Sequence, residues 1–214
     1  FEAPFIWDGT SNLVVEMSCL NAPSVIRLEA GAAPSGSNGI VDDGSRRAYA
    51  FQAGDQMTLP ASVAATLTNQ ITIAFWAYGN ERAFPVNNNV FEAFDAQGRR
   101  VLNAHLPWSN GNLYWDAGRT GGSMDRIEGP MPAGATGGAW NHWAFVKNAS
   151  TGEIVVYRNG QSVLSGTGKT LPMTGITKFM FGAGAAGSYP GILDEMQVWS
   201  TALSADDIRA WMHR

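Results

Sequence analysis

The segment WNHWAFVKNASTGEIVVYRNGQSVLSG, residues 140–166, decides the fold class of this chain. It holds three short runs rich in β-branched and aromatic residues, separated by the turn sequences STG and RNGQ. Gly and Asn-Gly between such runs are typical of tight β-hairpins, because these residues tolerate the backbone angles of the turn. The segment therefore predicts three consecutive strands, at residues 140–148, 153–160 and 161–166.

The same alternation of short strands and turns extends along most of the chain. Residues 30–45 are rich in Gly, Ala and Ser and predict a loop. Further strands are expected at residues 13–19, 47–60, 71–79, 112–118, 178–184 and 191–199, and on either side of the turn DAQG at 95–98. About ten to twelve short strands with hardly any helical periodicity predict an all-β antiparallel sandwich.

The tail SADDIRAWM, residues 204–212, departs from this pattern. Ser204 followed three residues later by Asp207 is a helix-capping pair, and Ile208 and Trp211 share one apolar face. A short C-terminal helix is therefore expected. Because no internal repeat or long linker divides the chain, we expect one domain over residues 1–214, in which residues 1–12 could be a linker from a preceding domain.

The composition argues against several classes of function. With 14 Lys and Arg against 18 Asp and Glu the net charge is −4, and no basic cluster offsets it, so nucleic acid is not an expected partner. The single cysteine, Cys19, allows no internal disulfide. The longest apolar stretches are too short to span a bilayer.

Three segments resemble a known family. AYAFQAGDQMTLP (48–60) with LTNQITIAFWAYGN (67–80), the hairpin segment at 140–166, and GILDEMQVWSTALSADDIRAWM (191–212) are similar in order and spacing to the laminin-G-like jelly rolls of the concanavalin A-like lectin/glucanase superfamily. The resemblance covers residues 47–212. It implies a jelly roll of two antiparallel sheets packed face to face.

The resemblance also implies a calcium site. In this superfamily a Ca²⁺ often ties the final strand to an early loop, and the aspartate of the closing Asp-Glu motif, here Asp194, commonly supplies a ligand. The loop SGSNGIVDDG (35–44) could add backbone carbonyls and a carboxylate from Asp43 or its neighbour Asp42, which are ligands that Ca²⁺ prefers. We expect such an ion to have a structural role.

Two catalytic functions of jelly-roll enzymes fit the residues poorly. Glycoside hydrolysis needs two carboxylates facing one bond, whereas Glu92 and Asp95 are three residues apart and point to opposite faces of a strand. A polysaccharide lyase could use His105 and Tyr114, but no arginine-rich strand accompanies them and the Gln-x-His signature is absent. We therefore do not expect an enzyme.

Sugar recognition needs an exposed aromatic face with polar groups beside it. The resemblance implies that Trp76, Trp143 and Trp199 are buried, because the family buries tryptophans in these strand motifs, and Trp140 opens its strand in the same way. Trp211 lies on the apolar face of the expected helix. The segment HLPWSNGNLYWDAG (105–118) is different, because Trp108 lies at a turn.

Alternation along this hairpin predicts which side chains share its polar face. His105 should lie with Asn103 and Val101, whereas Trp115 should lie in the core with Leu113 and Ala117. The candidate ligand-binding residues are Trp108, Asn110, His105, Tyr114 and Asp116.

The sequence thus favours a non-catalytic, lectin-like module that binds a glycan or polysaccharide. We expect it to be part of a larger secreted, extracellular or cell-surface protein of bacterial type. The alternative is a structural or protein-interaction domain that has another protein as its partner and no sugar site.

Overall fold

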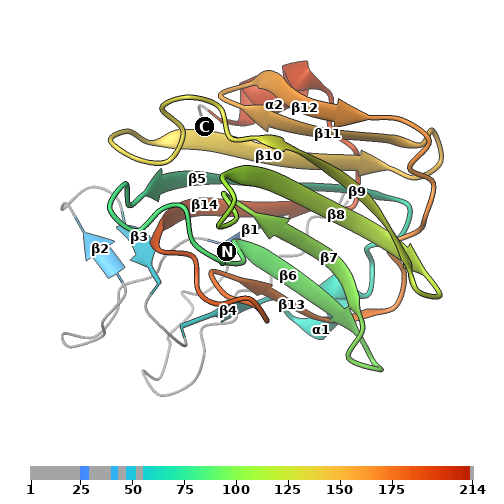
Figure 1. Cartoon of the computed structure of the whole chain (residues 1–214). Coiled ribbons are helices and arrows are strands. Elements are labelled where there is room, and N and C mark those ends of the chain that lie inside the picture. Colours follow the sequence, from blue (N-terminus) through green and yellow to red (C-terminus); the bar gives the residue numbers. More distant parts are fainter. Residues whose placement is uncertain (1–24, 29–39, 43–46, 52–54, 213–214) are drawn as a thin grey trace, which may run out of the picture.

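A computed structural model of the chain describes residues 25–28, 40–42, 47–51 and 55–212. These residues form fourteen strands and two short helices, and the strands make two antiparallel sheets (Figure 1). The predicted all-β sandwich with a short C-terminal helix is confirmed. The expected strand at 13–19, Cys19 and the suggested linker at 1–12 lie outside the described residues.

The larger sheet has eight strands, and seven of them follow the order β12-β11-β10-β5-β14-β3-β2. The eighth strand, β1, pairs with the second half of β14, while β3 pairs with its first half. The bounds are β1 Val25–Leu28, β2 Ile40–Asp42, β3 Arg47–Ala50, β5 Gln70–Gly79, β10 Asn141–Asn148, β11 Glu153–Arg158, β12 Gln161–Gly166 and β14 Gly191–Trp199.

The smaller sheet has six strands in the order β4-β13-β6-β7-β8-β9. Four of its strands, β6 to β9, are consecutive in the sequence and are joined by hairpins, so they lie side by side in Figure 1. The bounds are β4 Met57–Thr58, β6 Phe91–Asp95, β7 Arg100–His105, β8 Asn112–Thr120, β9 Ser123–Pro130 and β13 Ile176–Phe181.

Aromatic side chains fill the space between the two sheets. Phe75 on β5 stacks on Phe145 of β10 with ring centroids 5.9 Å apart, and Phe91 of β6 meets Phe145 edge-on at 5.1 Å. Trp115 of β8 is fully buried against the same rings, as its alternation predicted. Each such ring stabilises the fold by about 1.5–3 kcal/mol through removal of apolar surface from water.

One buried ion pair crosses this apolar layer. Lys147 of β10 is fully buried, and its Nζ donates to Asp125 Oδ2 of β9 and to the backbone oxygen of Leu171, both at 2.8 Å. It also donates to the backbone oxygen of Ala117 on β8. Burial lowers the pKa of the Lys147 ammonium group, while the hydrogen bond to Asp125 opposes that shift. The pair thus connects the two sheets.

Helix α2, Ala205–Trp211, covers part of the outer face of the larger sheet. Ser204 accepts a hydrogen bond from the Asp207 amide, and the Asp207 side chain accepts one from the Ser204 amide, so the predicted capping box is present. Ile208 is buried against the sheet, and Trp211 packs edge-on against Trp199 with centroids 6.0 Å apart.

Four elements were not expected from the sequence: β1, β2, the one-turn helix α1 at Ala61–Ala64, and β9. Strand β2 lies within the segment 30–45 that was expected to be a loop. Strand β9 has a weak apolar pattern because its inward-facing Asp125 is charged, and that position is tolerable because Lys147 on the other sheet and the Leu171 amide both donate to the carboxylate.

The predicted burial of the tryptophans is correct for Trp143 and Trp199 and wrong for two others. Trp140 is 41% exposed because it precedes β10 and is not part of the sheet. Trp76 is only partly buried because it follows the inward-facing Phe75 and therefore lies on the outer face of β5.

Candidate functional site

The candidate site lies on the outer face of the six-stranded sheet, where three polar residues form a row across the strands. Glu92 on β6 pairs with Asn103 on β7, and Asn103 pairs with Asp116 on β8. Adjacent residues such as Phe91 and Trp115 point into the core, so alternation directs the three polar side chains to the other face. All three are fully buried, which means that other groups cover them.

Asn103 is the centre of the hydrogen-bond network in this row. Its Oδ1 accepts from Asn89 Nδ2, and its Nδ2 lies 2.9 Å from His105 Nε2 and 3.3 Å from Asp116 Oδ2. An asparagine amide has two N–H donors and one carbonyl acceptor, and here all of them are used. Asn103 therefore fixes the positions of His105 and Asp116.

His105 is held in one neutral tautomer. Its Nδ1 contacts the backbone oxygen of Asn88, which can only accept, so Nδ1 carries the proton and Nε2 accepts from Asn103. Burial lowers the pKa of His105 below its ordinary value of 6.5, although the Asn88 carbonyl and the Asp116 charge act in the opposite direction. The ring is uncharged at neutral pH, and both nitrogens are engaged.

Each buried carboxylate of the row is covered by an arginine. Arg126 of β9 donates through Nε and Nη2 to the two oxygens of Asp116, at 2.5 and 2.8 Å, and this hydrogen bonding raises the pKa of Arg126. Arg100 of β7 donates through Nε to Glu92. The arginine side chains are 47% and 31% exposed, so they screen the carboxylates and reach the solvent themselves.

A loop between β13 and β14 closes one end of the row. The Ala185 amide donates to Glu92 Oε2 at 2.5 Å, and the Ala186 amide donates to Asn89 Oδ1 at 2.7 Å. Gly184 allows this close approach, because a Cβ there would lie 2.3 Å from Glu92 Oε2. The polar row thus fixes the loop on the sheet.

Aromatic residues border the other end of the row. Trp108, in the turn between β7 and β8, is partly exposed, and its ring lies 4.2 Å from the His105 ring. The Tyr114 ring lies 5.8 Å from His105, and Arg126 lies over Tyr114 at 5.1 Å. Asn110 Nδ2 donates to the Tyr114 hydroxyl at 2.7 Å.

The structure thus brings together all five residues that the sequence nominated for ligand binding. Trp108, Asn110 and Tyr114 form the partly exposed rim, and His105 and Asp116 lie buried beneath it. The rim is open to solvent, whereas the buried His105 and Asp116 contact the rim residues from beneath and help to hold them in place. Their role in binding stays a prediction.

One expectation about this face is wrong. Val101 was expected beside His105 but is part of the core, because β7 has an extra residue between its pairings to Ala93 and Phe94. Such a bulge reverses the alternation for the residue that it inserts.

Sequence reasoning did not nominate Glu92, Asn103 or Arg126 for the site, although it placed Asn103 on the same face as His105. Glu92 was considered only with Asp95, which instead closes the β6–β7 turn through Arg99. Arg126 lies on the unexpected strand β9, where the alternation of Asp125, Arg126, Ile127 and Glu128 could have revealed it.

Of the expected calcium ligands, Asp194 and Asp42 lie on the other sheet. Asp194 is on β14 at a register shift, partly buried, and its Oδ1 accepts from the Glu195 amide at 2.8 Å. Asp43 lies outside the described residues. No group of three or more His, Cys, Asp or Glu side chains suited to a metal occurs within the described part of the chain. The calcium site stays a prediction.

The sequence profile of the concanavalin A-like lectin/glucanases superfamily matches residues 51–209, about three quarters of the chain. The chain belongs to this superfamily. The predicted resemblance is thereby confirmed, and the matched region includes β4–β14, with every residue of the polar row and its aromatic rim. No sequence among the curated proteins matches this superfamily member.

Solved structures share the superfamily fold at low sequence identity. Domain 4 of AbnA, a GH43 extracellular arabinanase from Geobacillus stearothermophilus, in complex with arabinotriose, is 20% identical with a TM-score of 0.59, over 87% of this chain and 86% of that one. The CBM40 of the Ruminococcus gnavus IT-sialidase, bound to α2,3-sialyllactose, is 18% identical with a TM-score of 0.60, over 76% and 95%.

A third similar structure is the ligand-binding domain of botulinum neurotoxin serotype D in complex with N-acetylneuraminic acid. It is 14% identical with a TM-score of 0.59, over 74% of this chain and 39% of that one. At these identities the three likenesses establish the fold. Among the described residues of this superfamily member, no helix is long and apolar enough to cross a membrane.

Proposed function

We propose that this protein is a non-catalytic carbohydrate-binding module with a lectin-like site at the rim of the six-stranded sheet. The observation that carries the proposal is the partly exposed Trp108, which lies against the buried His105 and beside Tyr114. A tryptophan held in this way offers a flat apolar surface to the C–H face of a sugar ring. Because the ring is already positioned, little side-chain entropy is lost on binding.

The three similar structures, which hold arabinotriose, sialyllactose and N-acetylneuraminic acid, support a saccharide as the ligand class. The polar groups beside Trp108 suit sugar hydroxyls. Asn110 and Glu128 are exposed at the rim, and Arg126 extends its guanidinium group over Tyr114. Such groups donate and accept hydrogen bonds in fixed directions, which is what recognition of a hydroxyl pattern requires.

The charges of the site favour an uncharged ring over an acidic one. Arg126 and Arg100 are already paired with the buried carboxylates of Asp116 and Glu92. Glu128, whose Oε2 lies 3.9 Å from Arg126 Nη1, adds a further negative charge beside the guanidinium group. A ligand carboxylate would meet these like charges, whereas neutral hydroxyls would not.

The hydrogen bonds of the row support a binding role over a catalytic one. A general base needs a lone pair that can reach the substrate, and both His105 nitrogens are used within the protein. Asp116 and Glu92 are held as ion pairs by arginine. These residues therefore position the rim. We also infer that the module belongs to an extracellular or cell-surface protein, like the arabinanase domain that it resembles.

The test is binding to an array of neutral and acidic glycans, followed by titration calorimetry with arabinotriose and α2,3-sialyllactose as probes. The Trp108→Ala variant should bind the responding glycan at least about tenfold more weakly, since stacking on an aromatic ring contributes about 1 kcal/mol or more beyond its area. Trp140→Ala is the matched control, because that tryptophan is exposed beside the other sheet.

Each outcome tests a different part of the proposal. Equal binding by wild type and Trp108→Ala would contradict the placement of the site at Trp108 but not the carbohydrate-binding function. Preference for sialyllactose would contradict the charge argument. Failure of every glycan to bind would contradict the function and favour the protein-interaction alternative. New reducing ends or unsaturated products in the incubated glycan would contradict the non-catalytic role.

A further inference from the structure

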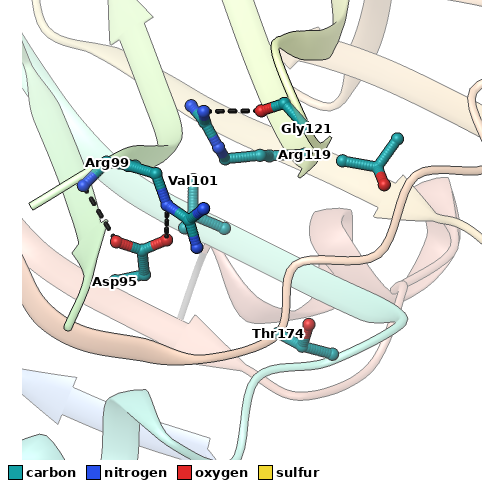
Figure 2. A pocket seen from close by; sticks show the side chains of 7 residues that line it. Asp95, Arg99, Val101, Arg119, Gly121 and Thr174 are labelled. Carbon is teal, nitrogen blue, oxygen red and sulfur yellow. Dashed lines mark hydrogen bonds and ion pairs between the residues drawn. The ribbon is translucent and has the colours of Figure 1, made fainter. Parts of the chain in front are cut away.

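A hollow lies at the opposite end of the same sheet from Trp108. It has a volume of about 230 Å³ and is lined by residues of the β6–β7 turn and the β8–β9 hairpin, together with Thr174. Strand β7 runs from this hollow to His105, and its five residue steps of extended chain separate the hollow from His105 by roughly 17 Å. Figure 2 shows Arg99 and Arg119 on neighbouring walls, with Thr174 across from them.

Arg119 leaves one strong donor unused. Its Nη2 donates to the Gly121 backbone oxygen at 2.6 Å, and its Nη1 makes a long contact of 3.4 Å with the Arg100 backbone oxygen. Its Nε is buried and has no hydrogen-bond partner. A guanidinium group with no acceptor at Nε and only a long contact at Nη1 is incompletely satisfied, so an oxygen that reaches its Nη atoms is favoured.

The acidic residue of the hollow does not fill that need. Asp95 accepts from Arg99 Nε at 2.7 Å and from the amides of Gln97 and Arg99 at 3.0 and 2.9 Å. Burial alone would raise the pKa of Asp95, but these hydrogen bonds outweigh it and lower the pKa. Asp95 is thus ionised and neutralised by Arg99, which leaves the charge of Arg119 uncompensated among the residues that line the hollow.

Arg99 supplies a second donor at the same place. Its Nη2 donates to Gln97 Oε1 at 3.0 Å, its Nε is used by Asp95, and its Nη1 has no partner among the described residues. Thr120 and Thr174, both exposed, line the hollow and add hydroxyl groups. Planar guanidinium groups with open N–H positions match the oxygens of carboxylates, sulfates and phosphates.

We propose that this hollow is a binding site for a single oxyanion group, a carboxylate or a sulfate, held by the guanidinium groups of Arg119 and Arg99. The two arginines provide charge-assisted donors, and Thr120 and Thr174 complete the set of polar contacts. The net positive charge of the hollow contrasts with the chain as a whole, which has a net charge of −4. The site is separate from the sugar site at Trp108 and does not depend on it.

The test is an NMR titration that follows the side-chain Nε–H resonance of each arginine. Sodium sulfate and sodium glucuronate are added separately to the full chain at constant ionic strength, and sodium chloride serves as the reference. The Arg119 resonance should shift along a saturable curve with sulfate, glucuronate or both, and the stronger ligand identifies whether the oxyanion is a sulfate or a sugar carboxylate. The exposed Arg82 should not respond.

Variants decide the assignment. Arg119→Met should abolish the saturable shifts of the Thr120 and Gly121 amides. Arg119→Lys keeps the charge but lacks the planar guanidinium group, and should weaken binding at least tenfold. Arg82→Met and Trp108→Ala should leave anion binding unchanged, which separates this site from the sugar site. The proposal would be overturned if the Arg119 resonance responded to sulfate and glucuronate no more than to chloride, or if a folded Arg119→Lys protein bound the anion unchanged.

Discussion

Replacing Lys147 by Met tests whether the buried ion pair holds the two sheets together. Methionine has nearly the same length but carries no charge and donates no hydrogen bonds. The change leaves the Asp125 carboxylate, 12% exposed, with the Leu171 amide at 2.8 Å as its remaining partner. It also removes the donor to the backbone oxygens of Ala117 and Leu171.

The expected loss is large because one charge of a buried pair stays behind. Breaking such a pair by removing one partner costs about 3–5 kcal/mol. For a domain of this size each kcal/mol lowers the melting temperature by about 2–4 °C, so the expected decrease is roughly 6–20 °C. The pair lies next to the site, since Asp125 adjoins Arg126 and Ala117 adjoins Asp116.

Thermal and urea unfolding of the variant measure this loss. Lys178→Met is the matched control, because Lys178 is an exposed strand residue, and it should change stability by less than about 0.5 kcal/mol. The double variant Lys147→Met/Asp125→Leu should recover much of the loss, because no unpaired charge remains. A decrease below about 1 kcal/mol for Lys147→Met alone, with unfolding still cooperative, would refute the reasoning.

Three further predictions concern the cap, the histidine and the metal. Ser204→Ala should cost about 1 kcal/mol at pH 7. Hydrogen bonds from Ser204 lower the pKa of Asp207, so the carboxylate part of the cap contributes fully above the ordinary pKa of 3.8 and is lost as the pH falls through the lower folded-state pKa. The cost should therefore shrink as the pH is lowered from 7 to 2, and an unchanged cost by calorimetry over that range would contradict this. Because burial lowers the pKa of His105, its contribution is complete above pH 6.5 and is lost as the pH falls through its folded-state pKa. Wild type should therefore lose more stability than His105→Gln between pH 7.5 and 5, and parallel melting curves would argue against it. If Asp194 and Asp43 hold a structural Ca²⁺, EDTA should lower the melting temperature, and an unchanged midpoint would rule the ion out.

Local patterns were sufficient where each strand follows its own alternation. The hairpin at 140–166 and the capped helix after Trp199 were predicted because turn residues, capping residues and apolar spacing all agree there. Local patterns failed at β9, where Asp125 faces inward, and at Val101, where a bulge reverses the alternation. In both cases a partner on another strand sets the outcome.

The candidate site divides in the same way. Trp108, Asn110, His105, Tyr114 and Asp116 lie within one hairpin, so their proximity follows from the Asn-Gly turn and from alternation. Glu92, Arg126 and the loop at 183–187 come from other elements. Strand pairing brings Glu92 and Arg126 into the same row, and the loop reaches it because Gly184 has no side chain.

The sequence by itself therefore determined the class of fold, the family and the hairpin that carries the candidate site, because these depend on periodicity and turn chemistry within short segments. Only the tertiary structure decided which charges are buried, how His105 is protonated, and that Arg119 has an unused donor beside Arg99. The physical reason is that the free energy of a buried polar group depends on its partners. In this protein those partners lie on neighbouring strands and on the facing sheet, at distances along the chain that no local pattern encodes.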